Sequence, residues 1–382
     1  MIKQIQIVNF KALRFHTPLK LGKVNLLTGA NGKGKSSFCQ ALLVLSQSWR
    51  QGMMRNLLPN GSWVHLGGYK DILYSHSTSN YICYNIVTGE KQEEEFYLEY
   101  NQSEANTMIG ELSLAKVGGK PISDEAGSNE MSSNTDAGSE TAVQLSTLND
   151  YPSLMALKNM CYIASERRAA PYREPVLSFA EPSYLMPDGS NILNVLYQKT
   201  GAIQEVESLM VRLFKDAKIS LIKTENDMVL TMNSVRNDGL YMPINVGFGY
   251  SYILSLLTAL VIAPKGSTMI VENPEAHLHP SAQSELMNIL MEYAWNNNIQ
   301  LFVETHSDHV LNATLLAVKN PEARPTTEDT QVLFFSTSKN EMDYNEVIVR
   351  NLEISQQGHI LNPPKSFFEQ YALDLRALYR PN

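Results

Sequence analysis

Cysteine is scarce in this sequence: Cys39, Cys83 and Cys161 are the three cysteines among 382 residues. Disulfide frameworks and cysteine-based zinc sites use cysteines at short, paired spacings, and these three lie far apart. We therefore expect neither kind of site. Sparse and unpaired cysteines suit a reducing compartment, so the composition predicts a cytoplasmic protein.

Long apolar runs are also missing. No run reaches the ~18 residues that a membrane-spanning helix needs, and the longest, at 253–264, is broken by Ser255 and Thr258. We interpret that run as a buried helix. The N-terminus does not have the charged and apolar segments of a secretion signal. The sequence therefore predicts no secretion signal and no membrane partner.

Positive charge is not in excess, because 31 lysines and arginines stand against 39 aspartates and glutamates, for a net charge of −8. This balance disfavours a dominant nucleic-acid-binding surface, although it allows a local basic patch. The hydrophobic content of 43% is ordinary for a globular protein, and the length suits one large or two modest domains.

What the sequence does contain is a complete phosphate loop. Residues 29–36 read Gly-Ala-Asn-Gly-Lys-Gly-Lys-Ser and match G-x-x-x-x-G-K-S, with an apolar strand at 24–28 before them and a helical pattern at 36–45 after them. Those flanks argue against a chance match in a glycine-rich turn. The motif predicts ATP and Mg²⁺ as ligands, with Lys35 on the β- and γ-phosphates and Ser36 on the metal. The residues expected to hold the nucleotide are Asn31, Gly32, Lys33, Gly34, Lys35, Ser36 and Ser37.

Two further strands end in polar residues. An apolar run at 267–272 ends in Glu272 and is followed by Asn-Pro-Glu-Ala-His-Leu-His-Pro at 273–280. A second run, 299–304, is followed by Thr-His-Ser-Asp at 305–308. A carboxylate at the end of a buried strand beside a P-loop is well placed to bind Mg²⁺ through water, so we expect Glu272 to be a metal ligand together with Ser36.

The order of these motifs, with a glycine-rich segment at 246–251 between them, resembles the ATPase heads of the ABC class. Within that class the chain resembles the RecF/SMC-like and OLD-like branch. The resemblance is carried by Asn9-Phe10-Lys11 after a first strand, by the motif at 272–280, and by a tail at 358–363 and 366–370. It covers residues 1–100 and about 240–382. The tail is similar to that of compact bacterial AAA-type ATPases, many of which belong to phage-defence operons.

The resemblance implies a homodimer that holds ATP between the P-loop of one copy and a glycine-serine signature of the other. Gly247, Gly249 and Ser251 match that signature, although the glutamine usual near the serine is missing. The alternative is a glycine turn before a core helix. His306 matches the switch histidine that contacts the γ-phosphate, and the alternative for it is a packed core histidine.

The resemblance also implies that the residue after Glu272 is normally the glutamate that activates the attacking water. Here it is Asn273, and a carboxamide orients water but does not accept its proton. Glu275 lies three residues beyond Glu272 and would replace the base if the turn places it inward. We therefore expect slow hydrolysis. His277 and His279 lie in the same segment, the D-loop of the family, rather than in a metal site.

The predicted fold is α/β: a P-loop NTPase with an ABC-type head, in which helices flank a mixed central sheet beside an antiparallel β lobe and a small lid subdomain. The expected parts are the N-terminal half of the head at 1–102, a flexible acidic insertion at 103–150, the lid at 151–240, the C-terminal half of the head at 241–318, and a tail at 319–382. We expect that tail to complete the sheet or dock a partner.

Three hypotheses for function follow. The first is an ATPase that dimerises around ATP and controls a partner effector, a nuclease or toxin encoded nearby, in prokaryotic anti-phage defence. The second is a RecF-like DNA repair or replication ATPase, and the third is a nucleotide-sensing scaffold with little hydrolysis. The sequence lacks the Asn-Lys-x-Asp motif of GTPases, which argues against a GTPase. It also lacks the heptad repeat of a coiled-coil arm and, after His306, the Asp-x-Asp motif of a Toprim nuclease domain.

Overall fold

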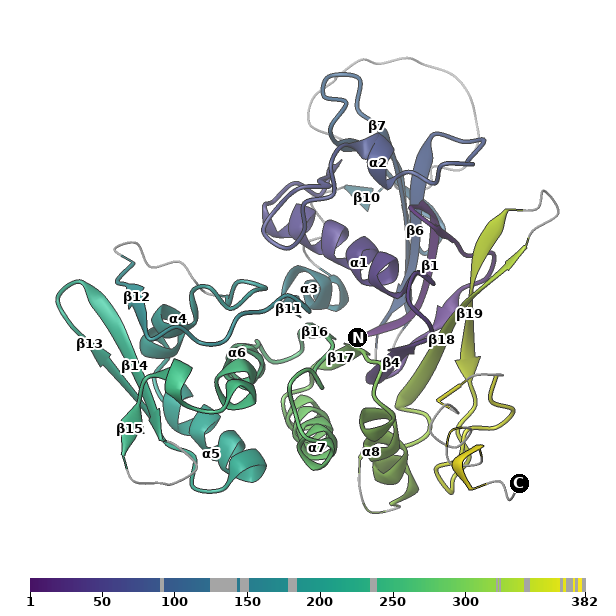
Figure 1. The fold of residues 1–382 in the computed structure, drawn as a ribbon. Coiled ribbons are helices and arrows are strands. Elements are labelled where there is room, and N and C mark those ends of the chain that lie inside the picture. Colours follow the sequence, from purple (N-terminus) through teal and green to yellow (C-terminus); the bar gives the residue numbers. More distant parts are fainter. Residues whose placement is uncertain are drawn as a thin grey trace, which may run out of the picture.

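Figure 1 shows a computed structural model of the chain. It describes residues 1–89, 93–123, 143–144, 151–177, 184–233, 239–320, 322, 324–339, 344–364, 367–368, 374 and 377–379. These residues form three sheets, which belong to a central layer, a lobe and a lid. Within the described ranges, no helix is both long enough and apolar enough to cross a bilayer.

The central sheet has the strand order β11-β16-β17-β4-β18-β19, in which β19 is antiparallel to β18 and the other pairs are parallel. Its strands are β4 (Val24–Thr28), β11 (Cys161–Ile163), β16 (Thr268–Glu272), β17 (Gln300–Glu304), β18 (Thr330–Lys339) and β19 (Asn345–Leu352). All residues of β4, β16 and β17 are buried, because the sheet is covered on both faces. The predicted mixed sheet is confirmed.

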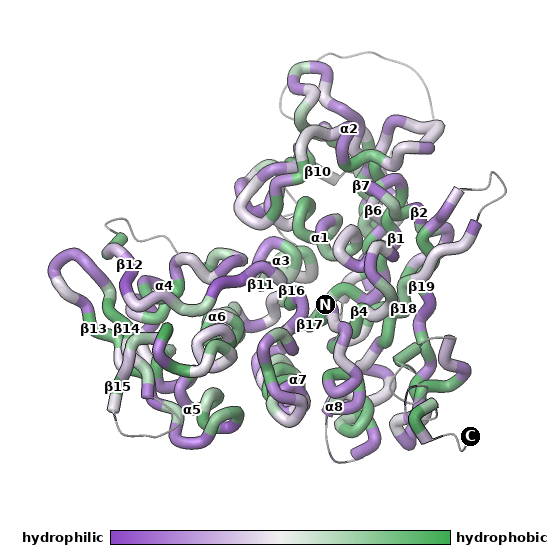
Figure 2. The backbone as a smooth tube through the Cα atoms, in the orientation of Figure 1, coloured by the Kyte–Doolittle hydropathy of each residue, from purple (hydrophilic) through white to green (hydrophobic). Residues whose placement is uncertain are grey.

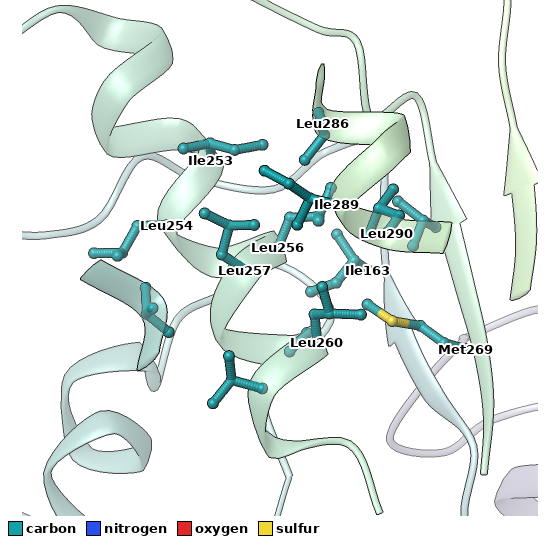
Figure 3. Packing of buried hydrophobic residues seen from close by; sticks show 14 of the residues in the cluster. Ile163, Ile253, Leu254, Leu256, Leu257, Leu260, Met269, Leu286, Ile289 and Leu290 are labelled. Atoms are coloured by element: carbon teal, nitrogen blue, oxygen red, sulfur yellow. The ribbon is translucent and has the colours of Figure 1, made fainter. Parts of the chain in front are cut away.

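Helices cover the two faces of this sheet (Figure 1). One face is covered by α6 (Phe248–Ile262), α7 (Pro280–Asn296) and α8 (Asp308–Lys319), and the other by α1 (Lys35–Arg50) and α3 (Pro152–Lys158). Neighbouring residues of β4 point into different cores, Leu26 into the first and Leu27 into the second. In Figure 3, the leucines of α6 pack toward Ile289 of α7 and Met269 of β16. The buried helix predicted from the apolar run is therefore confirmed as α6.

The lobe is a largely antiparallel sheet in the order β10-β9-β8-β7-β6-β1-β2, with β3 paired to β1 and β5 to β8. Helix α1 lies between this sheet and the central one (Figure 1). The elements of the lobe are β1 (Ile2–Phe10), β2 (Leu13–Arg14), β3 (Leu19–Lys20), β5 (Asn56–Leu57), α2 (Tyr69–Ile72), β6 (Tyr81–Thr88), β7 (Glu94–Gln102), β8 (Gly110–Val117), β9 (Lys120–Ser123) and β10 (Val143–Gln144).

The expected insertion at 103–150 does not begin where its composition suggested. Strand β8 pairs with β7, and β9 pairs with β8, so residues 110–123 belong to the lobe. The polar residues of β8 alternate with apolar ones along an exposed strand, which the low overall hydrophobicity of the segment obscured. Residues 124–142 and 145–150 lie outside the described part of the chain.

The lid contains a small antiparallel sheet, β12-β14-β13 with β15 paired to β14, and two helices. Its elements are β12 (Arg173–Pro175), α4 (Ile192–Gln198), α5 (Ala202–Phe214), β13 (Ile219–Lys223), β14 (Asp227–Asn233) and β15 (Leu240–Tyr241). In Figure 2 the tip between β13 and β14 is hydrophilic, whereas β14 is hydrophobic. The lid starts later than the expected residue 151, because β11 pairs with β16 and α3 packs beside α1.

The C-terminal tail supplies β18 and β19, which complete the central sheet on the side of the P-loop strand β4. The first of the two roles expected for this tail is therefore confirmed. Of the tail segment 366–370 that contributes to the resemblance, Ser366, Glu369 and Gln370 lie outside the described residues.

Candidate nucleotide-binding site

The carboxyl ends of three parallel strands bring the predicted motifs together. Glu304 at the end of β17 is paired in register with Glu272 of β16 on one side and with Leu27 of β4 on the other. The P-loop begins directly after β4. Two carboxylates and the P-loop therefore share one edge of the central sheet.

The P-loop adopts a conformation that depends on glycine. Gly29, Gly32 and Gly34 have φ angles of 128°, 72° and 98°, in the region that side chains disfavour. A Cβ atom on Gly29 would lie 2.2 Å from the carbonyl oxygen of Phe335. This loop and the start of α1 line a cavity of about 310 Å³. Its lining residues are Ala12, Asn31, Gly32, Gly34, Lys35, Ser36, Ser37 and Glu304.

Lys35 is buried inside the loop that precedes it. Its ammonium donates hydrogen bonds to the carbonyl oxygens of Gly29 at 2.8 Å and Ala30 at 3.1 Å, and it lies 3.9 Å from Glu304. Burial lowers the pKa of Lys35, and the charge of Glu304 opposes that shift. Phosphate oxygens would be stronger acceptors for this ammonium than the two carbonyls. The other lysine of the loop, Lys33, is directed elsewhere and donates to the Thr337 hydroxyl at 2.9 Å.

Glu304 is the site residue that the sequence analysis missed. Both of its carboxylate oxygens lie 3.3 Å from the Ser36 hydroxyl, so Glu304 contacts the predicted metal ligand directly. Burial, followed by the negative charge of Glu272, raises the pKa of Glu304 to about 7, while Lys35 and Ser36 act in the opposite direction. The available signal was that Glu304, like Glu272, ends an apolar strand.

The donor atoms at this edge suit Mg²⁺. Ligand atoms of Cys39, Glu272 and Glu304 lie within 4.8 Å of one another. Burial raises the pKa of the Cys39 thiol well above its usual value, so it stays protonated and is a poor ligand. The remaining oxygen atoms, from Ser36, Glu272 and Glu304, are the hard ligands that Mg²⁺ prefers. Burial also raises the pKa of Glu272, and a backbone N–H from Ser165 at 3.2 Å opposes this.

Asn273 and Glu275, which are predicted to orient and activate the attacking water, follow β16, and His306 follows β17. The backbone N–H of Asn273 donates to the Glu304 carbonyl at 2.8 Å, and the backbone N–H of His306 donates to Oε1 of Glu275 at 2.8 Å. Glu275 is thus turned toward the backbone of His306. Within the described part of the chain, Oδ1 of Asn273 and Oε2 of Glu275 are buried without a hydrogen-bond partner. Buried acceptors of this kind are usually satisfied by a ligand or water.

The ring of His306 is exposed, unlike that of a packed core histidine. Partial desolvation, followed by the charge of Lys35, lowers the pKa of His306, and Glu275 opposes this. The imidazole is therefore neutral near pH 7. A neutral imidazole can donate one hydrogen bond without adding charge.

The expected signature begins α6 and lies away from the P-loop of its own chain. Gly247 is the exposed N-cap, and a Cβ on Gly249 would lie 2.5 Å from the His277 carbonyl oxygen. Ser251 is only 2% exposed, and its hydroxyl donates a hydrogen bond to the Phe248 carbonyl at 3.1 Å. The backbone at Gly247 is thus presented to solvent, whereas the Ser251 hydroxyl is turned inward in this structure.

Arg167 connects the segment after β16 to the signature helix. Arg167 is buried, and its guanidinium donates to the carbonyl oxygens of Glu272 at 2.8 Å and Asn273 at 2.9 Å. It also lies over the ring of Tyr252 in α6, 4.3 Å from the centroid. Arg168 is exposed and pairs with Asp188 at 3.4 Å.

Comparisons with known proteins agree with this arrangement. A family model described as an AAA ATPase domain matches residues 186–311. An uncharacterized protein of Methanocaldococcus jannaschii, MJECL11, is 32% identical over 69 residues, which are 18% of this chain. The chain spans 58% of the length of that relative.

Among solved structures, an Smc head bound to the C-winged helix domain of ScpA is 13% identical, with a TM-score of 0.55 over 92% of this chain and 98% of that one. A Pyrococcus furiosus Smc head with an extended coiled coil, bound to the C-terminal domain of ScpA, is 11% identical, with a TM-score of 0.51 over 99% of each chain. Likeness at this identity establishes the fold. The expected fold, that of an Smc-like ATPase head, is confirmed.

The raised pKa of Glu304 predicts a pH-dependent metal site. Mg²⁺ favours the charged carboxylate, so Mg²⁺ affinity should rise by up to roughly tenfold per unit between pH 5.5 and 7 and level off above that. Isothermal titration calorimetry in buffers of different ionisation enthalpy would detect the released proton. In Glu304→Gln the proton release should disappear. Binding that is independent of pH across this range would contradict the prediction.

Arg167→Ala should destabilise the fold, because the carbonyls of Glu272 and Asn273 would lose their buried donors. We expect a loss of about 2–4 kcal/mol in the free energy of unfolding, measured by urea denaturation. Arg168→Ala is the matched control and should change it by less than about 0.5 kcal/mol. If the two variants unfold alike, the Arg167 hydrogen bonds do not stabilise this turn.

Proposed function

Starting from the fold of an ABC-class ATPase head, we propose that this protein binds Mg-ATP at the P-loop, dimerises around the nucleotide and hydrolyses it slowly. The observation that carries the proposal is the meeting of Lys35, Ser36, Glu272 and Glu304 at one sheet edge. A buried cation next to a glycine loop suits a polyphosphate. Two buried carboxylates beside a serine hydroxyl suit the Mg²⁺ that accompanies it.

Each residue has a separate role in this proposal. Lys35 leaves its carbonyl partners to bind phosphate, and the backbone N–H groups of the loop bind the remaining oxygens. Ser36, Glu272 and Glu304 would hold Mg²⁺, which supplies positive charge to the phosphate oxygens when bound. Neutral His306 donates a hydrogen bond toward the γ-phosphate.

Glu275 is the base that we assign to the attacking water. Glu275 is the carboxylate of the segment at 273–280 that follows β16. Its Oε2 is buried and has no hydrogen-bond partner among the described residues. Asn273, with its own buried and unpartnered Oδ1, orients the water but does not take the proton. A base displaced by two residues from the usual position is consistent with slow turnover.

The biological role that we propose rests on the family resemblance. We propose that closure of the dimer controls a partner effector in anti-phage defence. The Smc heads that share this fold are bound to another protein, ScpA, which supports the use of such a head as a docking platform. A nucleotide-sensing scaffold is the second candidate, because Asn273 replaces the usual base. Stimulation of hydrolysis by DNA would favour the RecF-like alternative instead.

Light scattering with and without Mg-ATP tests the central proposal. Wild type should double in mass with Mg-ATP, and Lys35→Ala should not, because it loses the buried ammonium.

Nucleotide affinity is a second test, for which Lys33→Ala is the matched control, since the Lys33 ammonium points to Thr337. We expect it to bind a fluorescent ATP analogue within roughly threefold of wild type, and Lys35→Ala to bind at least roughly tenfold more weakly. If both variants bind the ATP analogue equally well, Lys35 does not bind the nucleotide, and the proposed role of the P-loop is wrong.

Glu275→Gln tests the assignment of the base. It should lower the rate of phosphate release by about 10²–10⁴-fold while ATP binding is retained. Glu285→Gln, at an exposed salt bridge with Arg212, is the control and should hydrolyse ATP like wild type. Unchanged release by Glu275→Gln would exclude this residue as the base. No release by wild type itself would favour the scaffold.

A further inference from the structure

The turn that carries Glu275 lies beyond the last residue of β16, so strand pairing does not fix the position of this carboxylate. Two residues of the turn, Asn273 and His277, have positive φ angles of 45° and 63°. Such a backbone is unfavourable for residues other than glycine and persists only where surrounding contacts hold it. The geometry of Glu275 therefore depends on what holds the segment at 273–280.

Gln283 of α7 holds the second half of this turn, whereas Arg167 holds its start. The Nε2 of Gln283 donates a hydrogen bond to the Leu278 carbonyl at 2.8 Å. The Oε1 of the same amide accepts a hydrogen bond from the Ser307 hydroxyl at 2.6 Å. Because Ser307 directly follows His306, one side chain joins the segment after β16 to the segment after β17.

These contacts belong to a closed ring of hydrogen bonds. The backbone N–H of His306 donates to Oε1 of Glu275 at 2.8 Å, and the N–H of Leu278 donates to the Glu275 carbonyl at 3.1 Å. From Gln283 the ring runs through Ser307 and His306, and it returns through Glu275 and Leu278. Because Oε1 of Glu275 is held in this way, the direction of Oε2, which is buried without a partner among the described residues, is set as well.

An amide suits the place between the two segments. The Leu278 carbonyl needs a donor, and the Ser307 hydroxyl needs an acceptor. A carboxylate offers only acceptors and an ammonium only donors, whereas the amide of Gln283 offers both. The Ser307 oxygen already accepts from the N–H groups of His309 and Val310 at the start of α8, so its one hydrogen is directed to Gln283.

We infer that Gln283 is a positioning residue for hydrolysis, which sets the Glu275 carboxylate through Ser307 and His306. This inference rests on the proposed function, in which Glu275 is the base. In that step Oε2 of Glu275 takes the proton of the attacking water and the water oxygen bonds to the γ-phosphorus. The β–γ bridging oxygen leaves with the electron pair of its bond to that phosphorus. Gln283 acts only on the alignment of the base, to which such a step is sensitive.

Gln283→Met tests the inference, because it keeps the side-chain length and the helix propensity but removes both hydrogen bonds. Steady-state phosphate release should show kcat lowered roughly 10- to 100-fold, as expected for a misaligned base. The KM for ATP should stay within roughly twofold of wild type. The stoichiometry of binding a fluorescent ATP analogue should not change, which shows that the variant is folded. Gln204→Met, the same substitution at an exposed position of α5, is the matched control and should hydrolyse ATP like wild type.

A double-mutant cycle tests whether Gln283 acts through Ser307. Ser307→Ala removes the hydroxyl that bonds the amide, so it should lower kcat to a similar extent. Adding Gln283→Met to Ser307→Ala should then lower kcat by less than roughly a further twofold, because the bond is already lost. A purely structural effect of the two substitutions would instead multiply the two losses.

The outcomes separate this inference from the proposed function. A wild-type kcat in Gln283→Met, or losses that multiply in the double variant, overturns the inference and leaves the proposed function intact. A wild-type kcat in Ser307→Ala overturns it too, which keeps the test valid if Gln283→Met does not fold. A wild type that binds ATP but releases no phosphate overturns both the proposed hydrolysis and this inference.

Discussion

Two buried carboxylates side by side are the constraint around which the rest of this site is arranged. Parallel pairing puts Glu272 directly beside Glu304, and each is at most 8% exposed. Like charges this close and this buried cannot both ionise without compensation. The protein supplies part of it through Lys35, and the pKa of about 7 at Glu304 shows that the compensation is incomplete. In the proposed function, a divalent metal supplies the missing positive charge. The carboxylate pair would then be unfavourable in the free protein and favourable with the metal bound, so the feature that lowers stability would also raise the affinity for the metal.

The rest of the edge serves to hold these groups where they are. Helices on both faces of the central sheet exclude water from β16 and β17, and this burial is the first cause of each shifted pKa in the site. Arg167 holds the turn after β16 by its carbonyl oxygens, so it does not occupy the Glu272 carboxylate, which accepts from the Ser165 N–H instead. A guanidinium is suited to this task, since its planar fork of donors reaches several acceptors at once.

Much of this arrangement could be predicted from sequence, and the exceptions share a physical cause. The P-loop, its flanking strand and helix, the buried helix α6 and the strands that end in carboxylates follow from local pattern. Glu304 was missed because its role depends on the register in which β17 pairs with β16 and with β4, and a local sequence pattern does not show that register. The role of Arg167 could not be predicted, because its partners are backbone carbonyls, which carry no sequence signal. Strands β8 and β9 were hidden by a polar composition that an exposed strand tolerates.

A chain of contacts joins the outer surface of the signature to the buried carboxylates. Phe248, which is half exposed, stacks on Tyr252 with centroids 5.6 Å apart, and Tyr252 carries the Arg167 guanidinium on its ring. Arg167 in turn holds the carbonyl of Glu272. Phe248, Tyr252 and Arg167 thus form one continuous series of contacts from the surface to the turn that carries Glu272. Because packed interiors transmit strain rather than absorb it, the packing of this one aromatic ring fixes the position of the arginine that holds the turn.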